Sequence, residues 1–427
     1  MTDIESALDE IRDRGLMRRM RMISGPQGPR VLLDGRPVLL LCSNNYLGLA
    51  DHPRVREAAA EAAMRYGAGA GASRLVSGTM RIHRRLEERL AEFKGSETAL
   101  LFGSGYLANV GIVQALARSG EVVFSDALNH ASIVDGCRLA GAETFVYAHR
   151  DVEHLAWGLE QAGGRGSLIV TDGVFSMDGD LAPLPEIVEL AQRHDARVMV
   201  DEAHGTGAVG PDGRGAVAAA GLEDEVDLIV GTLGKALGSY GAYVCCDRRM
   251  AKYLVNTART LIFSTAIGPP AVAAAMAALQ LLREQPHRVE KLQRNGAVLR
   301  EALAGEGLPV VASETQILPL MIGDAEEAVL VSERALERGV FAQAIRPPTV
   351  PVGGSRLRLT VMASHTKAEL RDAAKTIAAA VPASVRTGLA QRALQAQALA
   401  DALPAGSTRA AEGDGRSRIF DRLAGAA

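Results

Sequence analysis

Hydrophobic residues in the middle of this 427-residue chain fall into two alternating patterns. Short runs rich in valine, isoleucine and leucine, without polar alternation, predict strands of a sheet that is covered on both faces. Stretches with helical periodicity, such as 81–94 and 184–194, separate several of these runs. The alternation predicts an α/β fold with a mainly parallel sheet. The predicted strands are 98–102, 121–125, 167–171, 197–200, 227–231 and 242–246.

The two ends of the chain have different patterns. The first forty or so residues predict a helix and then a hairpin over 30–41, which turns at Asp34 and Gly35. After Gly268, two prolines can open a helix but not continue one, and a smaller α+β pattern follows. We therefore predict an N-terminal helix and hairpin segment (1–45), a large domain (46–268), a C-terminal small domain (269–382) and a poorly ordered or peripherally helical tail (383–427).

Composition narrows the class of protein. A net charge of −3 and a pI near 6.3 argue against a nucleic-acid-binding surface. The four cysteines form no Cys-x-x-Cys pair and the nine histidines show no metal-ligand spacing, so we expect no metal and a reducing compartment. The first residues are acidic, unlike a signal peptide, and the longest apolar stretch contains Gly268 and two prolines. We expect a soluble cytoplasmic protein without membrane contact.

Chemistry is expected beyond the carboxyl ends of the strands, where α/β folds bind ligands. Gly103-Ser104-Gly105 follows the first strand and opens a helix, so its backbone N–H groups could hold a phosphate. A strand-to-helix turn without a ligand would have the same sequence pattern. Tyr106 could pack under a flat ring or in the core. His130, after the second strand, could stack on such a ring or serve as a polar loop residue.

An acidic residue follows a buried strand in Asp201-Glu202-Ala203-His204. Burial of that carboxylate is costly unless it meets a cation, which the protonated nitrogen of a bound heteroaromatic ring would supply. His204 could hydrogen-bond a phenolic oxygen on the same ring. A helix-capping role for Asp201 explains the residue equally well.

Lys235 lies in a turn of small residues, Thr232-Leu233-Gly234-Lys235, directly after another strand. Partial burial there would lower the pKa of the amine and favour imine chemistry. A lysine by itself is usually a solvated surface residue, so its significance depends on Asp201 and His130 reaching the same sheet edge.

Together these motifs resemble the α-oxoamine synthases, which are fold type I enzymes dependent on pyridoxal 5'-phosphate (PLP). The resemblance extends from about residue 18 to residue 383. It implies a mainly parallel, seven-stranded-type sheet in a large PLP-binding domain with a smaller α+β C-terminal domain. The most specific stretches are 44–49, 171–180, 201–205 and 232–235.

The resemblance also implies roles around the cofactor. Lys235 is expected to form the Schiff base with PLP, Asp201 to pair with the pyridinium and His130 to stack on the ring. His204 and Ser176 are expected to flank the phenolic oxygen. The phosphate is expected to contact Gly105, Tyr106 and Thr232, together with Ser264 and Thr265 from the neighbouring subunit of a homodimer.

Substrate roles follow from the same resemblance. Arg358, with Asn44, is expected to bind the carboxylate of an amino acid. Arg18 and Thr349 are expected to face an acyl substrate, and the neighbouring Arg19 is the alternative to Arg18.

Residues 345–351 and 356–359 look most like the family branch that condenses L-alanine with a pimeloyl thioester, of coenzyme A or of an acyl carrier protein, in biotin biosynthesis. Two alternatives stay open: a sibling enzyme that uses glycine or serine with another acyl thioester, and a catalytically silent binding subunit. Silent members normally lose the Schiff-base lysine, so Lys235 argues against the last.

Overall fold

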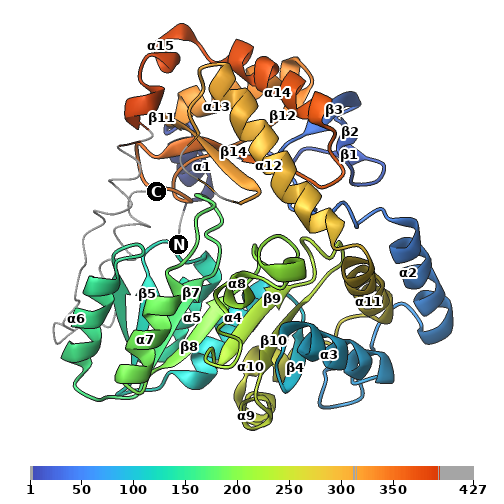
Figure 1. The fold of residues 1–427 in the computed structure, drawn as a ribbon, viewed down its shortest axis with the longest axis vertical. Helices are drawn as coiled ribbons and strands as arrows, with labels where there is room; N and C mark the ends of the chain where they lie inside the picture. Colours follow the sequence, from blue (N-terminus) through green and yellow to red (C-terminus); the bar gives the residue numbers. More distant parts are fainter. Residues whose placement is uncertain (1–2, 311–312, 314, 393, 395–427) are drawn as a thin grey trace.

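A seven-stranded sheet forms the centre of the larger part of the molecule (Figure 1). The structure is a computed structural model and describes residues 3–310, 313, 315–392 and 394. The strand order is β4-β10-β9-β8-β7-β5-β6, and only β10 runs antiparallel to its neighbours. The predicted α/β fold class is therefore confirmed. The strands are β4 (Thr98–Phe102), β5 (Val122–Asp126), β6 (Glu143–Tyr147), β7 (Ser167–Asp172), β8 (Arg197–Asp201), β9 (Leu228–Thr232) and β10 (Ala242–Cys246).

The six predicted strands agree with the observed ones to within one residue at each end. Their apolar character explains this accuracy, because all residues of β5 and β10 are buried. The prediction missed β6, which lies at the edge of the sheet and begins with the exposed Glu143. An edge strand with a polar start lacks the continuous apolar run that identified the others.

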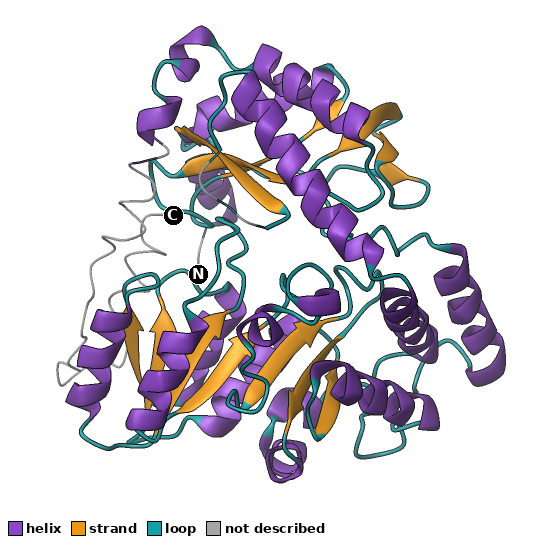
Figure 2. Ribbon diagram, viewed as in Figure 1, coloured by secondary structure: helices purple, strands orange, loops and turns teal. Residues whose placement is uncertain are grey.

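Helices pack on both faces of this sheet (Figure 2). Strands covered in this way need hydrophobic residues on both sides, which is why the sequence pattern lacks alternation. The helices of the larger part, not all of which touch the sheet, are α2 (Pro53–Tyr66), α3 (Arg81–Lys94), α4 (Gly105–Leu116), α5 (Ala131–Ala140), α6 (Val152–Ala162), α7 (Leu184–Arg193), α8 (Ala216–Ala220), α9 (Arg248–Thr257), α10 (Arg259–Ile262) and α11 (Pro269–Glu284), with a 3-10 turn at Pro211–Gly213.

The smaller part contains an antiparallel sheet in the order β11-β14-β13. Its strands are β11 (Ile317–Gly323), β13 (Gln343–Ile345) and β14 (Ser355–Thr360), and its helices are α12 (His287–Gly305), α13 (Ala325–Glu337), α14 (Lys367–Ala380) and α15 (Ala383–Arg386). Helix α11 begins at the predicted proline pair. The domain boundaries themselves stay a prediction. Most of the predicted tail, residues 393 and 395–427, lies outside the described residues.

The N-terminal segment packs with the smaller part (Figure 1). It contains α1 (Ile4–Asp13), β1 (Ile23–Ser24) and the predicted hairpin, β2 (Arg30–Leu33) and β3 (Arg36–Leu40). The hairpin turns at Asp34 and Gly35, whose φ angles of 48° and 79° are those of a two-residue turn that favours glycine. Strand β3 pairs in parallel with β12 (Val340–Phe341), about three hundred residues away in the chain.

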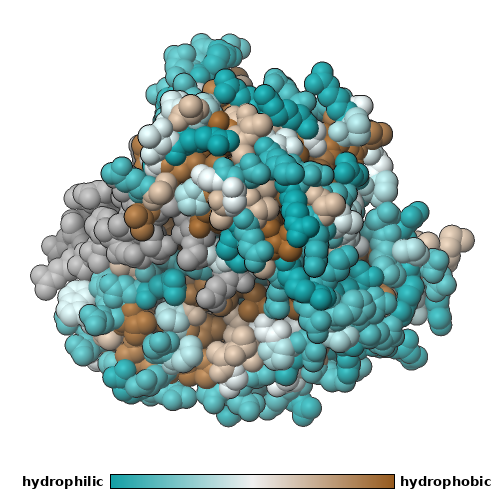
Figure 3. Space-filling view, turned by 45° about the horizontal axis from the view of Figure 1, so that its top comes forward, coloured by the Kyte–Doolittle hydropathy of each residue, from teal (hydrophilic) through white to brown (hydrophobic). Residues whose placement is uncertain are grey.

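Within the described part of the chain, no helix combines the length and apolar character that a membrane crossing needs. Figure 3 shows one face of the molecule, on which hydrophilic residues predominate and hydrophobic residues appear in smaller groups between them.

A buried ion pair anchors the loop after α2. Arg74 Nη2 lies 2.8 Å from Glu87 Oε1, and their side chains are 9% and 3% exposed. The same Glu87 oxygen accepts a hydrogen bond of 3.1 Å from the Leu101 backbone in β4. This loop also forms a bridge between Ser73 and Thr265. The ion pair therefore fixes the segment that carries Ser264 and Thr265.

We predict that Glu87→Ala destabilises the protein by about 3 kcal/mol, because it leaves a buried guanidinium unpaired and removes the acceptor of the Leu101 N–H. Denaturant unfolding followed by circular dichroism measures this loss. The matched control is Glu92→Ala, also on α3, which breaks an exposed pair with Arg283 of α11 and should leave the unfolding midpoint in place. Equal midpoints for both variants would contradict the prediction.

Candidate functional site

The lysine predicted to be reactive lies in a chain of polar contacts. Lys235 Nζ is 2.7 Å from His204 Nε2, and His204 Nδ1 is 2.6 Å from the hydroxyl of Tyr46. Tyr46 and His204 are buried. The Tyr46 hydroxyl donates to Asn44 Oδ1 at 3.0 Å. The structure thus connects the lysine turn after β9, the loop after β8 and the segment after β3.

The surroundings of Lys235 bring the pKa of its amine closer to neutral pH. Burial lowers the pKa of Lys235 to about 8, although the charges of Asp201 and Asp172 act in the opposite direction. The pKa of His204 falls well below its ordinary value, first through burial and then through the charge of Lys235. Because the Tyr46 hydroxyl donates to Asn44, a neutral His204 donates from Nδ1 to that hydroxyl and accepts a hydrogen bond from Lys235 at Nε2. The arrangement suits an amine that gains and loses a proton near neutral pH.

Asp201 ends β8 and is buried. Its carboxylate accepts hydrogen bonds from Asn109 Nδ2 at 2.6 Å and from the Ala203 backbone at 2.8 Å. Among the described residues, no Lys, Arg or His nitrogen lies within 4.0 Å of it. Asp172 is opposite Asp201 in the register of β7 and β8, and burial raises its pKa well above the ordinary value. A buried carboxylate that meets only neutral donors is suited to a cationic ligand group.

His130 caps the N-terminus of α5 and is exposed. Its Nδ1 accepts from the Ser132 backbone at 3.3 Å and lies 2.7 Å from Ser132 Oγ. Asn109 Nδ2 donates to that same hydroxyl at 2.9 Å. Asp201 and His130 are therefore coupled through Asn109 and Ser132, and no hydrogen bond from a described residue reaches the Nε2 of this imidazole.

Gly105 opens α4 as predicted, with Ser104 as the cap. A Cβ built on Gly105 meets no heavy atom within 4 Å, so open space lies beside this helix start. At the end of β9, Thr232 Oγ1 accepts from the Gly234 backbone at 3.2 Å and donates to the Gly241 carbonyl. Tyr106 is 47% exposed and its hydroxyl donates to Asp135, so it does not pack in the core. Free N–H groups and a hydroxyl of this kind can hold a phosphate.

Arg358 reaches this site from β14 of the smaller part. Its buried guanidinium donates to the Ser176 carbonyl, to Asn44 Oδ1 at 3.2 Å and to the Tyr46 hydroxyl at 3.3 Å. Within the described ranges, no carboxylate lies within 4.0 Å of this cation. A fixed guanidinium fork without an anionic partner is suited to the carboxylate of a ligand.

The residues predicted to face an acyl group lie at an exposed edge. Arg18 Nη2 donates to the Pro347 carbonyl at 3.3 Å, and the exposed Thr349 is two residues further along. Arg19 instead lies 3.8 Å from Glu333 Oε2. The structure therefore brings Arg18, rather than Arg19, to the segment that contains Thr349.

Two predicted residues lie apart from the others. Ser264 is half-buried and Thr265 is exposed, and in the described chain neither side chain hydrogen-bonds another candidate residue. The prediction assigned them to the site of a neighbouring subunit, so a single chain leaves this assignment untested.

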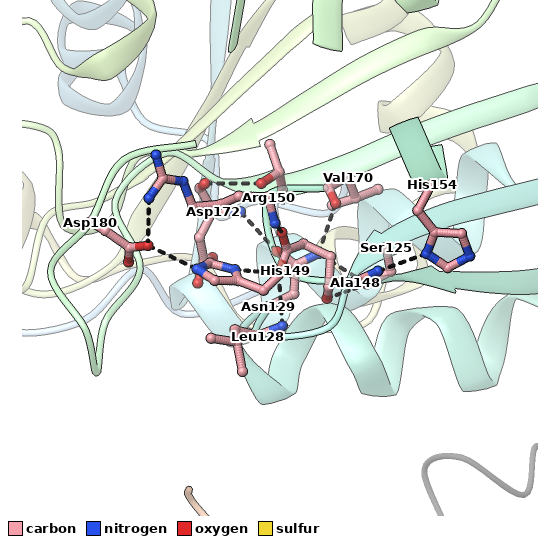
Figure 4. A network of polar contacts seen from close by, with 12 residues as sticks. Ser125, Leu128, Asn129, Ala148, His149, Arg150, His154, Val170, Asp172 and Asp180 are labelled. Carbon is pink, nitrogen blue, oxygen red and sulfur yellow. Dashed lines mark hydrogen bonds and ion pairs between the residues drawn. The ribbon is translucent and has the colours of Figure 1, made fainter. Parts of the chain in front are cut away.

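The prediction missed a buried polar network at the carboxyl ends of β5, β6 and β7 (Figure 4). His149 Nδ1 lies 2.9 Å from Asp126 Oδ1, and its Nε2 lies 2.8 Å from Asp180 Oδ2. Burial alone would lower the pKa of His149, but the two aspartates outweigh burial and raise that pKa to about 10. Because β6 was not predicted, the sequence analysis did not recognise that His149 follows the end of a strand. Polar residues just after the apolar strands, such as Asp126, were the available signal.

The chemistry of these residues fits PLP. The buried Asp201 has no cationic partner among the described residues, Lys235 has a desolvated amine, and the open space beside Gly105 lies at a helix N-terminus. A pyridinium, an aldehyde carbon and a phosphate are the groups that these three features would bind. The residues that could hold PLP are Gly105, His130, Ser176, Asp201, His204, Thr232 and Lys235.

Comparisons with known proteins agree with this chemistry. Residues 36–377 match the family model "Aminotransferase class I and II". The chain is 53% identical over 380 residues to an 8-amino-7-oxononanoate synthase of Citrifermentans bemidjiense, covering 88% of this chain and 97% of that protein.

Two solved structures have the same fold. A serine palmitoyltransferase from S. paucimobilis, solved with a bound PLP-myriocin aldimine, has a TM-score of 0.84 and 33% identity, covering 88% of this chain and 96% of that chain. An 8-amino-7-oxononanoate synthase from Francisella tularensis has a TM-score of 0.70 and 26% identity, covering 80% and 97%.

The buried His149 makes stability depend on pH. Its pKa in the folded protein, about 10, exceeds the ordinary 6.5, so the folded state binds this proton more tightly. The stabilisation is full below pH 6.5 and is lost as the pH rises to about 10. We predict that the gap in melting temperature between the parent protein and His149→Gln is largest near pH 6 and shrinks toward pH 10.

The control is His154→Gln, since burial lowers the pKa of His154 and gives its linkage the opposite sign. For His154→Gln, any pH-dependent difference in melting temperature from the parent protein should therefore appear below pH 6.5, the ordinary histidine pKa. A gap for His149→Gln that stays constant from pH 6 to pH 10 would show that His149 is not charged in the folded protein.

Proposed function

This chain belongs to the class I and II aminotransferase family, and from this premise we propose that it is an 8-amino-7-oxononanoate synthase, a PLP-dependent acyltransferase of the α-oxoamine synthase type. It condenses L-alanine with a pimeloyl thioester, releasing carbon dioxide and the free thiol, in biotin biosynthesis. The single observation that carries the proposal is that Lys235 is linked to Arg358 through His204 and Tyr46, while the charge of the buried Asp201 acts on Lys235. The relatives' shared activity supports the choice of substrates.

PLP supplies an electron sink that delocalises the charge of a carbanion at the substrate α-carbon. Asp201 would balance the pyridinium, and its hydrogen bonds from Asn109 and Ala203 keep the carboxylate oriented. His130 would lie on the ring, held by Ser132. Gly105, Tyr106 and Thr232 would hold the phosphate, and His204 and Ser176 the phenolic oxygen.

Lys235 is the proposed acid–base group for the α-proton. With a pKa of about 8, its amine is neutral in a useful fraction of molecules at neutral pH and can still deliver a proton afterwards. His204, 2.7 Å away, orients the amine and can hydrogen-bond whichever form it takes. Tyr46 fixes the ring of His204 from the other side.

Arg358 would hold the amino-acid carboxylate. Three oxygen acceptors, on Ser176, Asn44 and Tyr46, already orient its guanidinium, so little side-chain entropy is left to lose on binding. The carboxylate must leave as carbon dioxide. Arg358 would bind it only through hydrogen bonds, which allow the carbon dioxide to depart. Arg18, which donates to the Pro347 carbonyl, and the exposed Thr349 would contact the acyl substrate.

We also propose a homodimer that completes the phosphate site. Leu75, Val76 and Phe263 are 54%, 79% and 71% exposed. The bridge between Ser73 and Thr265 places these side chains beside Ser264 and Thr265. Large hydrophobic residues grouped around two hydroxyls favour burial against a second copy of the chain, with the hydroxyls delivered to its site.

The proposed reaction is tested by a panel of L-alanine, glycine and L-serine against pimeloyl and longer acyl thioesters, read by product mass. L-Alanine with the pimeloyl thioester should give the highest kcat/KM. Lys235→Ala should lower turnover by a factor of about 10³ or more, because the proton acceptor is lost. Preference for glycine or serine would overturn the substrate assignment, and full activity of Lys235→Ala would overturn the chemistry.

The shared site is tested by complementation. A subunit carrying Lys235→Ala still has intact Ser264 and Thr265, whereas one carrying Ser264→Ala with Thr265→Ala still has Lys235. A mixed dimer then contains one intact site, so an equilibrated mixture should recover about a quarter of the parent activity. Two affinity tags verify the mixed dimers. Verified mixed dimers without recovered activity would contradict the sharing of the site.

A further inference from the structure

His149 has an unusual environment for a histidine next to a catalytic edge. Its side chain is 1% exposed, and each ring nitrogen lies within 3.0 Å of an aspartate oxygen. Both nitrogens can donate only if the imidazole carries two protons. Phe175 packs edge-on against the ring, with 4.4 Å between centroids. Arg150 adds one further cation, 3.4 Å from Asp180.

Each of the two aspartates belongs to a different loop of the proposed site. Asp126 ends β5 and shapes the turn to His130, because its Oδ1 accepts from the Leu128 backbone at 2.8 Å. Asp180 closes the loop that carries Ser176, since its carbonyl accepts from the Phe175 backbone at 3.0 Å. His149 therefore joins the loop of His130 to the loop of Ser176 (Figure 4).

The Ser176 loop is also tied to the smaller part of the molecule. Arg358 donates to the Ser176 carbonyl, and Arg356 pairs with Asp178. Thr315 Oγ1 donates to the Gly179 carbonyl at 2.8 Å. The position of this loop between His149 and β14 thus bears directly on where the Arg358 guanidinium lies.

We propose that His149 is a positioning residue that clamps the loops of His130 and Ser176 together and thereby sets the place of Arg358 for the carboxylate of the amino-acid substrate. The inference rests on the proposed function, because it needs an amino acid as the substrate. His149 itself touches neither substrate nor cofactor in this role. It acts through Asp180, Ser176 and Arg358. A displacement of about 1 Å in such a chain is enough to impair catalysis severely.

The test measures binding of L-alanine to the holoenzyme by the absorbance of its bound PLP, together with KM, kcat and the melting temperature. His149→Gln should raise the Kd and KM for L-alanine about tenfold or more, with a smaller change in kcat. Asp180→Asn keeps the size of its side chain but loses the charge that holds His149, and should shift Kd in the same direction. If His149→Gln does not fold, the Kd of Asp180→Asn for L-alanine tests the proposal in its place.

The matched control is His154→Gln. His154 accepts a hydrogen bond of 3.0 Å from the Ala148 backbone, next to His149, but has no contact with either loop among the described residues. Its Kd for L-alanine should stay within twofold of the parent value. If folded His149→Gln or Asp180→Asn has a lowered melting temperature but an unchanged Kd for L-alanine, His149 has only a structural role. That result would overturn the inference. If the parent holoenzyme binds glycine or serine instead of L-alanine, the substrate assignment fails, and the preferred amino acid then becomes the probe for His149.

Discussion

Desolvation of ionisable groups at one edge of the large sheet is the constraint on which the site depends. Asp172 and Asp201 end two adjacent parallel strands, and Lys235 follows the next strand. Burial raises the pKa of Asp172 and lowers that of Lys235, so both groups are driven toward their neutral forms. Asp201 accepts hydrogen bonds from neutral donors, an arrangement suited to a cationic ring. The sheet provides the low-dielectric wall that makes these interactions strong.

The smaller part supplies what this edge lacks. Arg358 brings a guanidinium from β14 to within hydrogen-bonding distance of Tyr46, which in turn contacts His204. The cation that would bind substrate and the amine that would move its proton are therefore linked through one phenol. The loop around Ser176 lies between the two parts and is held by residues from both. Geometry at this junction, rather than in either sheet alone, should set the affinity for the amino acid.

Much of the fold was predictable because buried strands need continuous apolar runs. The predicted strands ending near Asp126 and Asp201 were accurate, and so was the hairpin at Gly35. Strand β6 was missed because its start is polar and lies at the sheet edge. The His149 network was missed with it, since a histidine after an unrecognised strand looks like any loop residue.

The sequence by itself determined the fold class, the family and the residue types that PLP chemistry requires, because each of these depends on local patterns: apolar runs, small-residue turns and motifs such as Asp201 to Gly205. Only the tertiary structure decided which side chains meet. The pairing of β3 with β12, the approach of Arg358 to Tyr46 and the position of His149 between two aspartates all join residues far apart in the chain. Such contacts are set by packing and by the burial of charge, and no local pattern encodes them.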